Sequence, residues 1–565
     1  MIEVATRAQR QSAPRKAQST MQKAAMFYRS CRLVYSENVS HLDDVRALLV
    51  NFGVRWPVRS NGTRLLPTLL GVSAAGWGWA SVLQFSLYNK TQVMVRPSAF
   101  FEKILVERFA MLTGGGEIQY HHQYFDSMVA AFSVNGNRAL SFEEHWQLEQ
   151  QILLNLSRAF TIVYPDRLNN THHERVRRLL GPKPFSHTEW KEQLRISFSL
   201  PEGDQLSLQV EHEEFFESFF SIVVSLGESA CSYFVGWVIA QALSLLASSE
   251  LINGFFMSHV EPDKGQLLFC ADVAHTYMGI AFYADFLSKE VGDTVIKDVE
   301  SIESSVHATF REQFARSAWS TAVPNALLDS EVVPESLKLV RLVSSGLLDQ
   351  IYGKYPDMGD NIFENIKRAA GSRRMVEYDV SARSLRRGHL PPFSFSSQNE
   401  FVLLPVAMGM PFYGLDTLPA VKYAMLGAEF AYALLCKVFN KDAAIDKSLR
   451  RLFRLKTPCF FGREILFTDV APQELEVVNR ATSLRIVAKA SAQSSPLSSP
   501  SRLPRYEDVT ETQLLLVFWC LVQCGSADGH RMCNYPVTAL ELFANAFRCR
   551  HGSSMVSGRD CVMID

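Results

Sequence analysis

The chain has 565 residues, of which 47% are hydrophobic and 20% are charged, so it has the composition of a globular protein of two to four domains. Its 57 lysines and arginines balance 58 aspartates and glutamates, for a net charge of −1. This balance provides no overall positive field and argues against a nucleic-acid partner.

Apolar residues recur at three- and four-residue spacing through most of the chain, which predicts a mainly α-helical protein. The segments with this pattern are 20–32, 98–112, 143–160, 214–226, 230–247, 271–288, 297–315 and 333–352. A short strand is predicted at Glu400–Pro405, followed by a loop and a helix from about Ala420 to Phe439. Residues 371–392 contain Gly, Pro and many charges and could form a hinge. Residues 489–504 are rich in Ser and Pro and are predicted to be disordered or a surface loop.

One uncharged run, Ala230–Ser248, could be a membrane span or a buried helix. Its length is borderline, and Glu228 and Glu250 flank it where basic anchors are expected. We therefore predict a core helix and no membrane span in this chain. The first twenty residues contain basic side chains but no apolar core, which is not the pattern of a signal peptide.

The histidines and cysteines give weaker signals. The adjacent pairs His121-His122 and His172-His173 are predicted to be surface residues, because neighbours on a helix point about 100° apart and chelate poorly. Ten cysteines suit a large extracellular domain with a few disulfides. N-x-[ST] sequons, the acceptor sites for N-glycosylation, mildly support secretion; they begin at Asn38, Asn61, Asn89, Asn155 and Asn169.

Several motifs together resemble the neprilysin and endothelin-converting-enzyme family of zinc endopeptidases. They are MQKAAMFYRSC (Met21–Cys31), YFVGWVIAQAL (Tyr233–Leu243), NEFVLLPVAMGMPFYGLDTLPAVKYAMLG (Asn399–Gly427), TQLLLVFWCLVQCG (Thr512–Gly525), LELFANAFRC (Leu540–Cys549) and MVSGRDC (Met555–Cys561). The match is strongest at the C-terminus and diffuse over about 35–340. Family members have a tail, an anchor or signal, and further cysteines upstream of the first motif, so the chain looks truncated at its N-terminus.

The resemblance implies a mainly α, two-lobed fold with a thermolysin-like C-terminal lobe and a small β element near 393–405. The expected domains are a helical lobe at 1–375 and a catalytic-type lobe at 376–565. In the family a cavity between the lobes admits short peptides, and the proteins are extracellular or at the cell surface. Short peptides are therefore the candidate partners.

The family's zinc helix carries H-E-x-x-H, with two zinc-binding histidines and a glutamate that acts as general base. Without gaps, these positions fall on Tyr432, Ala433 and Cys436. A rival register would place Ala428 and Tyr432 at the histidines and Glu429 at the base. Either register loses both imidazoles, because the chain has no histidine between His389 and His530.

The remaining site residues are also altered. The third zinc ligand belongs to an E-N-x-x-D motif, whose best match here has Ile465 for the Glu and retains Asp469, with Glu464 one residue away. The substrate-binding N-A-x-Y strand falls near Pro391–Ser394, where neither proline has an N–H to donate. His530 and Arg531 are candidates for the family's oxyanion-stabilising His and Arg.

The resemblance further implies disulfides between Cys31 and Cys270 and between Cys459 and Cys561. In the family, the equivalents of Cys524 and Cys549 pair with upstream cysteines. Here they could pair with each other, pair with Cys520 or Cys533, or remain thiols.

From these residues the leading hypothesis is a catalytically inactive family member that binds no zinc or other cofactor and retains peptide binding. The alternatives are an active zinc endopeptidase with divergent ligands and a non-functional truncated product.

Overall fold

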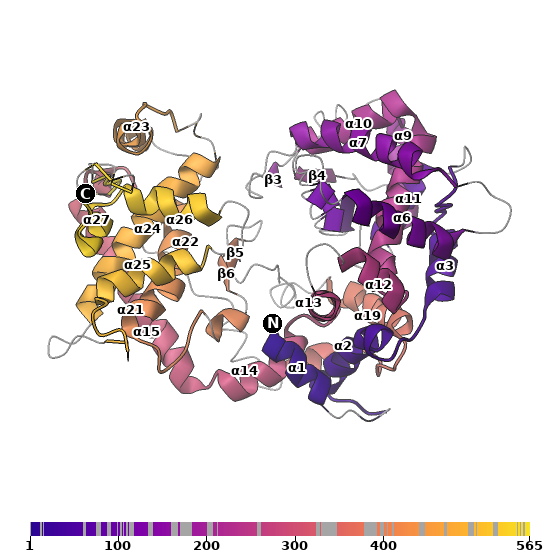
Figure 1. Ribbon diagram of the computed structural model, residues 1–565, viewed down its shortest axis with the longest axis horizontal. Coiled ribbons are helices and arrows are strands. Elements are labelled where there is room, and N and C mark those ends of the chain that lie inside the picture. Colours follow the sequence, from indigo (N-terminus) through magenta and orange to yellow (C-terminus); the bar gives the residue numbers. More distant parts are fainter. Residues whose placement is uncertain are drawn as a thin grey trace. The chain divides into compact units, whose positions relative to one another are not determined.

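The computed structural model describes residues 2–564 with interruptions (Figure 1). The longer gaps are 75–80, 112–117, 134–138, 160–167, 170–183, 201–206, 329–346, 378–392, 396–400, 440–446, 495–501 and 524–528. The described residues are mostly helical, as the sequence predicts. They form two compact units, one of Met1–Asp285 with Gly346–Arg386 and one of Phe286–Ser345 with Arg387–Asp565.

This division differs from the sequence-based one at 1–375 and 376–565 in the segment 286–345. That segment contains the long helix α15 (Asp293–Arg316), which packs against α22 (Ala428–Val438) and α24 (Pro472–Ser494). Its buried apolar side chains, such as Val299, Ile302 and Phe310, therefore belong to the core of the second unit.

The first unit contains most of the helices and a small sheet. Its helices are α1 (Ile2–Arg10), α2 (Thr20–Ser36), α3 (Leu42–Asn51), α4 (Leu65–Ala74), α6 (Ile118–Phe132), α7 (Phe142–Ala159), α9 (His187–Phe198), α10 (Glu213–Leu226), α11 (Glu228–Ser244), α12 (Ser249–Phe256), α13 (Pro262–Met278), the 3₁₀ helix η1 (Gly279–Tyr283), α18 (Leu347–Tyr352) and α19 (Ile362–Glu377). Helix α14 (Ala284–Glu290) crosses the boundary between the units.

Helix α11 forms the centre of this unit. All of Ala230–Ser244 is buried, with Phe234 and Trp237 at 1% and 0% exposure. The helix packs against α3, α4, α7 and α10, so the predicted core helix is confirmed. Within the described residues one helical stretch, Pro262–Glu290, has the length and hydropathy of a membrane span, but 72% of its apolar window is buried in the protein. Helix α11 passes the same test only together with α12, and the two helices are bent by 111° at the break between them.

The small sheet was not predicted. Its strands are β1 (Leu83–Leu87), β2 (Gln92–Pro97), β3 (Leu168–Asn169) and β4 (Ser207–Glu211), in the order β1-β2-β4-β3. β2 is antiparallel to β1 and parallel to β4. Alternate residues are buried, among them Phe85, Val93 and Val95. This alternation of buried and partly exposed residues was the available sequence signal. It extends over fewer residues than the helical patterns and is therefore harder to recognise.

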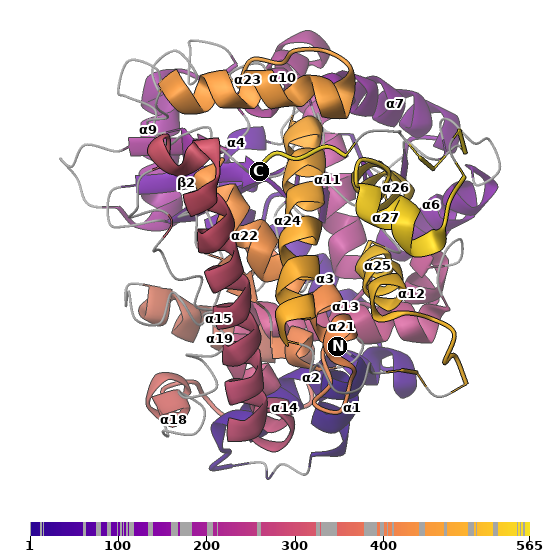
Figure 2. The same ribbon diagram turned by 90° about the vertical axis from the view of Figure 1, so that its left-hand side faces the viewer.

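The second unit is a bundle around α24. Its other elements are η2 (Ala318–Thr321), β5 (Phe393–Phe395), β6 (Phe401–Leu403), η4 (Pro405–Met408), α21 (Pro419–Lys422), the π-helical turn η5 (Tyr423–Gly427), α23 (Lys447–Phe461), α25 (Glu511–Leu521), α26 (Gly529–Thr538) and α27 (Glu541–Phe547). Figure 1 shows α24 packed among α22, α25 and α26, and Figure 2 shows α15 beside it. The antiparallel pair β5–β6 is the β element expected near 393–405.

The predicted loop at 489–504 is wrong over its first six residues. Residues 489–494 form the last turns of α24, where Ala490 is fully buried and Ser491 is 4% exposed. Alanine, lysine and glutamine are good helix formers, so the sequence KASAQS continues the helix once Ala490 has a core to contact. The serine- and proline-rich part from 495 to 501 lies outside the described residues.

Candidate functional site

The segment that resembles the zinc helix is helical from Pro419 to Val438, through α21, the π-turn η5 and α22. The predicted helix at 420–439 is confirmed to within one residue at each end. The π-turn ends at Gly427, where an added Cβ would lie 3.0 Å from Cγ2 of Val487 on α24. The glycine therefore lets the zinc-helix segment approach α24 closely.

Of the three H-E-x-x-H positions in the ungapped register, two face α24. The guanidinium carbon of Arg480 lies 3.9 Å from the centre of the Tyr432 ring. One turn later, Nδ2 of Asn479 lies 3.7 Å from Sγ of Cys436. Ala433, at the general-base position, is fully buried and carries no functional group. Tyr432 and Cys436, which stand at the two metal-binding positions of the motif, therefore contact Arg480 and Asn479 of α24.

The rival register places the base at Glu429, and this carboxylate is already bound. Glu429 is 3% exposed, and its Oε1 accepts a hydrogen bond of 2.5 Å from Nη1 of Arg480. Nε of Arg480 lies 3.6 Å from Oε1 of Glu476, another buried carboxylate. One guanidinium thus sits against two buried carboxylates and an aromatic face.

The residues assigned to the third-ligand motif lie elsewhere. Ile465 lies in the loop after α23, 2% exposed, with its backbone N–H bonded to Oγ1 of Thr457. Glu464 is exposed and paired with Arg454. Asp469 lies outside the described residues. None of these side chains is therefore seen at α22.

The carboxylate that does face α22 comes from α24, within Glu476-Val477-Val478-Asn479-Arg480. This pentapeptide has Glu at the first position of E-N-x-x-D and arginine where the motif has Asp. Sequence reasoning missed Glu476, Asn479 and Arg480 because Asp469 gave a better match to the motif's last residue. The usable signal was the Glu-to-Arg spacing of four, which puts both side chains on one helix face.

The electrostatics of this cluster favour a charged guanidinium at Arg480 and a neutral phenol at Tyr432. Burial alone would lower the pKa of Arg480, but Glu429, then Tyr432 and Glu476, raise it above its ordinary value. Burial, together with Cys436 and Glu476, raises the pKa of Tyr432 well above 10. At neutral pH the phenol is therefore protonated while Arg480 is charged.

This set does not fit zinc. A catalytic zinc site needs three deprotonated protein donors and an open position for water. Here the phenol is neutral, and a permanent positive charge lies over it at 3.9 Å. A dication placed beside Tyr432, Cys436 and Glu476 would be repelled by Arg480.

The other site candidates are only partly described. His530 is exposed on α26, and the guanidinium of Arg531 lies 5.5 Å from the ring centre of Tyr535 on the same helix. Pro391 and Pro392 lie outside the described residues. Phe393 and Ser394 belong to β5 and pair with Leu403 and Val402 of β6. None of these is seen to contact the α22–α24 cluster.

The two disulfides implied by the resemblance are present. The Cα atoms of Cys31 and Cys270 are 5.7 Å apart, and those of Cys459 and Cys561 are 5.4 Å apart. A third bridge joins Cys520 and Cys533, at 5.0 Å between Cα atoms. Cys549 is an unpaired thiol, and Cys524 lies outside the described residues.

Comparison with known proteins places the fold. No protein-family profile and no curated protein matches the chain. Among solved structures, PepO from Lactobacillus rhamnosis has a TM-score of 0.62 at 12% identity, and the match covers 100% of this chain and 94% of that one. Zinc metalloprotease Zmp1 from Mycobacterium tuberculosis, in complex with an inhibitor, has a TM-score of 0.57 at 13% identity, covering 100% and 91%.

Both of these proteins are neprilysin-family zinc metalloproteases. The chain therefore has the fold of that family over its full length, which confirms the resemblance carried by the sequence motifs. At 12% and 13% identity the likeness establishes the fold alone.

Proposed function

We propose that this protein is a neprilysin-type homologue that does not hydrolyse peptides through zinc and that retains a role in binding short peptides. The observation that carries the proposal is the position of Arg480. Its guanidinium contacts Tyr432 and Glu429, where the family's zinc helix would meet a metal ion. The guanidinium of Arg480 therefore supplies a positive charge where the family binds a zinc ion.

The chemistry follows from what is missing. Zinc-dependent hydrolysis needs a metal to polarise the scissile carbonyl and to lower the pKa of the attacking water, and a base to take its proton. Ala433 supplies no base, and Glu429 is held in its ion pair with Arg480. A guanidinium cannot lower the pKa of a water by coordination. The support for peptide binding is the shared fold alone.

The test is a peptidase assay joined to a metal measurement. The purified protein is incubated with short peptides that carry apolar residues at the cleavage site, with and without a chelator. We expect no chelator-sensitive cleavage and no zinc whose retention depends on Cys436 or Glu476. Turnover that a chelator abolishes, and that a Glu476→Gln variant loses, would instead establish an active enzyme with divergent ligands.

Peptide binding is tested separately by calorimetry with the same peptides. Binding without turnover is the expected result. Absence of both would favour the alternative of a non-functional product.

We also propose an extracellular or cell-surface location. Three disulfides support it, because such bridges persist in oxidising compartments. Asn38 and Asn155, two of the sequon residues, are exposed on the described surface. A shift in electrophoretic mobility on deglycosylation of the secreted protein, smaller in an Asn38→Gln/Asn155→Gln variant, is the expected result.

A further inference from the structure

A group of buried ionisable side chains lies in the first unit, whereas the α22–α24 cluster belongs to the second. It comprises His121 on α6 with His145 and Glu149 on α7, and all three side chains are at most 1% exposed. The prediction that His121 is a surface residue is therefore wrong. The residue faces inward because Phe142, Trp146 and Trp237 pack around its ring. Its neighbour His122 is half-exposed, as predicted.

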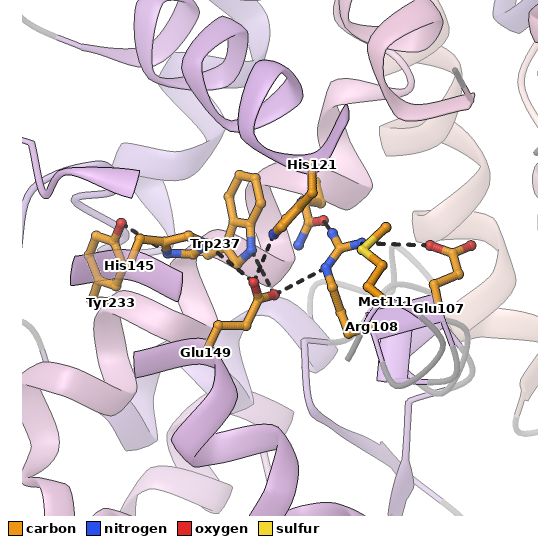
Figure 3. Close-up of polar contacts among 9 residues, drawn as sticks. Glu107, Arg108, Met111, His121, His145, Glu149, Tyr233 and Trp237 are labelled. Atoms are coloured by element: carbon orange, nitrogen blue, oxygen red, sulfur yellow. Dashed lines mark hydrogen bonds and ion pairs between the residues drawn. The ribbon is translucent and has the colours of Figure 1, made fainter. Parts of the chain in front are cut away.

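The three side chains converge on one point (Figure 3). Nε2 of His121 lies 2.9 Å from Oε2 of Glu149, and Nε2 of His145 lies 3.4 Å from the same oxygen. One donor atom from each residue lies within 4.8 Å of the other two. Tetrahedral zinc with bonds of about 2.0–2.1 Å separates its N and O ligands by about 3.3 Å. The two distances from the imidazole nitrogens to Oε2 of Glu149 are within a few tenths of an ångström of that value.

One atom of the group makes no hydrogen bond. Nε2 of His145 is buried, has no hydrogen-bond partner, and lies 3.4 Å from the oxygen that His121 also contacts. The other nitrogen of the same ring, Nδ1, lies 3.3 Å from the hydroxyl of Tyr233. When Nδ1 donates the hydrogen bond to Tyr233, Nε2 carries the lone pair and is free to bind a metal, which is how metal-bound histidines are commonly held.

The surrounding residues bind the other oxygen of Glu149. Its Oε1 accepts from Nε1 of Trp237 at 3.2 Å and from Nε of Arg108 at 3.4 Å. These contacts orient the carboxylate and keep Oε2 turned toward the two imidazoles. Arg108 is itself held by Oε1 of Gln241 at 2.9 Å and lies 4.0 Å from Glu107. These oxygens partly offset the positive charge of Arg108. This charge is the main feature of the site that opposes the binding of a dication.

We propose that His121, His145 and Glu149 form a binding site for a zinc-class divalent transition-metal ion in the first unit. Ions of this class bind well to two imidazoles and one carboxylate, whereas magnesium and calcium favour all-oxygen sites. Water would supply the fourth ligand. The site is independent of the α22–α24 cluster, and it departs from the expectation of no cofactor.

The test begins with chelator-treated, full-length protein titrated with Zn²⁺ and, separately, with Co²⁺. We expect about one ion per chain. His145→Gln is expected to weaken binding by at least about tenfold, a loss that even an outer-shell partner can cause. His122→Gln is the matched control and should leave binding unchanged, because His122 is half-exposed, pairs with Asp126 and stacks on Phe142.

X-ray absorption of the zinc-loaded wild type keeps the proposal testable if His145→Gln does not fold. A shell of nitrogen and oxygen neighbours alone supports the site. A sulfur neighbour at about 2.3 Å would place the ion at a cysteine, such as Cys436, and would overturn the proposal. Absence of binding, or equal binding by wild type and His145→Gln, would overturn it as well.

Discussion

The guanidinium of Arg480 lies 3.9 Å from the ring centre of Tyr432, and its Nη1 donates to Glu429 at 2.5 Å. This relationship links α24 to the helix that resembles a zinc helix. It also identifies which residues would have to change for a metal to enter.

Restoring a zinc site should require four substitutions. Tyr432→His, Ala433→Glu and Cys436→His recreate the helix motif, and Arg480→Asp removes the cation and supplies the motif's Asp. Glu476 is already present as the third ligand. We expect this variant to bind about one additional zinc per chain, measured by elemental analysis after dialysis.

The matched control keeps Arg480 and carries only the three α22 substitutions. It should bind no additional zinc, because the guanidinium remains beside the ligands. If the three-substitution variant binds zinc as well as the four-substitution variant does, Arg480 does not block the site. If only an added Ile465→Glu restores binding, the sequence-based third ligand was correct.

Removing the charge of Arg480 should destabilise the fold. In Arg480→Met the carboxylates of Glu429 and Glu476 lose their buried partner, and breaking a buried pair on one side typically costs about 3–5 kcal/mol. Denaturant unfolding measures the loss. Arg485→Met on the same helix is the control, because Arg485 pairs with Asp560 at the surface and should cost no more than about 1 kcal/mol.

A second variant distinguishes lost charge from lost packing. Arg480→Met combined with Glu429→Leu should recover part of the stability, since one stranded carboxylate is gone. An equal or larger loss in the double variant would mean that the side-chain volume of Arg480 matters more than its charge.

Gly427→Ala should destabilise the second unit. The added methyl would lie 3.0 Å from Cγ2 of Val487 and 3.3 Å from Cδ1 of Tyr423, which is closer than most real Cβ contacts. Overpacking of this kind typically costs about 1–3 kcal/mol. Thermal unfolding measures it, and Gly292→Ala, where a Cβ meets nothing within 4 Å, is the control.

Two cysteine thiols should differ in reactivity. Cys549 is partly exposed, whereas burial raises the pKa of Cys231 to about 12. Because the thiolate is the nucleophile, mild alkylation of the native protein at pH 8 should modify Cys549 and spare Cys231. Mass spectrometry of peptides locates the label. Labelling of Cys520 or Cys533 without reductant would contradict the bridge between them.

Acidification should destabilise the metal-free protein through His121. Burial, aided by Arg108, lowers the pKa of His121 to about 4, against the attraction of Glu149. The unfolded chain then binds more protons than the folded one between about pH 6.5 and 4. This stability is complete above about pH 6.5 and falls by about 2 kcal/mol by pH 5.

Unfolding of chelator-treated protein across this range measures the effect. His121→Gln should flatten the pH dependence, with His145, Glu149 and Arg108 left in place. A slope that is unchanged in this variant would assign the acid sensitivity to other groups. Below about pH 4.5 a further loss is expected, because His121 and Arg108 outweigh burial and hold the pKa of Glu149 well below its ordinary value.

The sequence by itself determined the helical segments, the buried character of α11, and two disulfides. Each of these is local or carried by a motif: a three-to-four spacing, an uncharged run, or a cysteine in a recognisable context. It also determined that no imidazole is available between His389 and His530. The absence of histidine from both zinc-ligand positions of the motif could therefore be inferred without the structure.

Only the tertiary structure decided which side chains meet. Periodicity tells that α24 is a helix, but not that Glu476 and Arg480 face α22 while Ile465 lies in a loop. The same holds for His121, whose pairing with Glu149 joins residues 28 positions apart on different helices. Contacts between helix faces depend on how the whole protein packs. The hydrophobic periodicity of one sequence therefore does not reveal which faces meet.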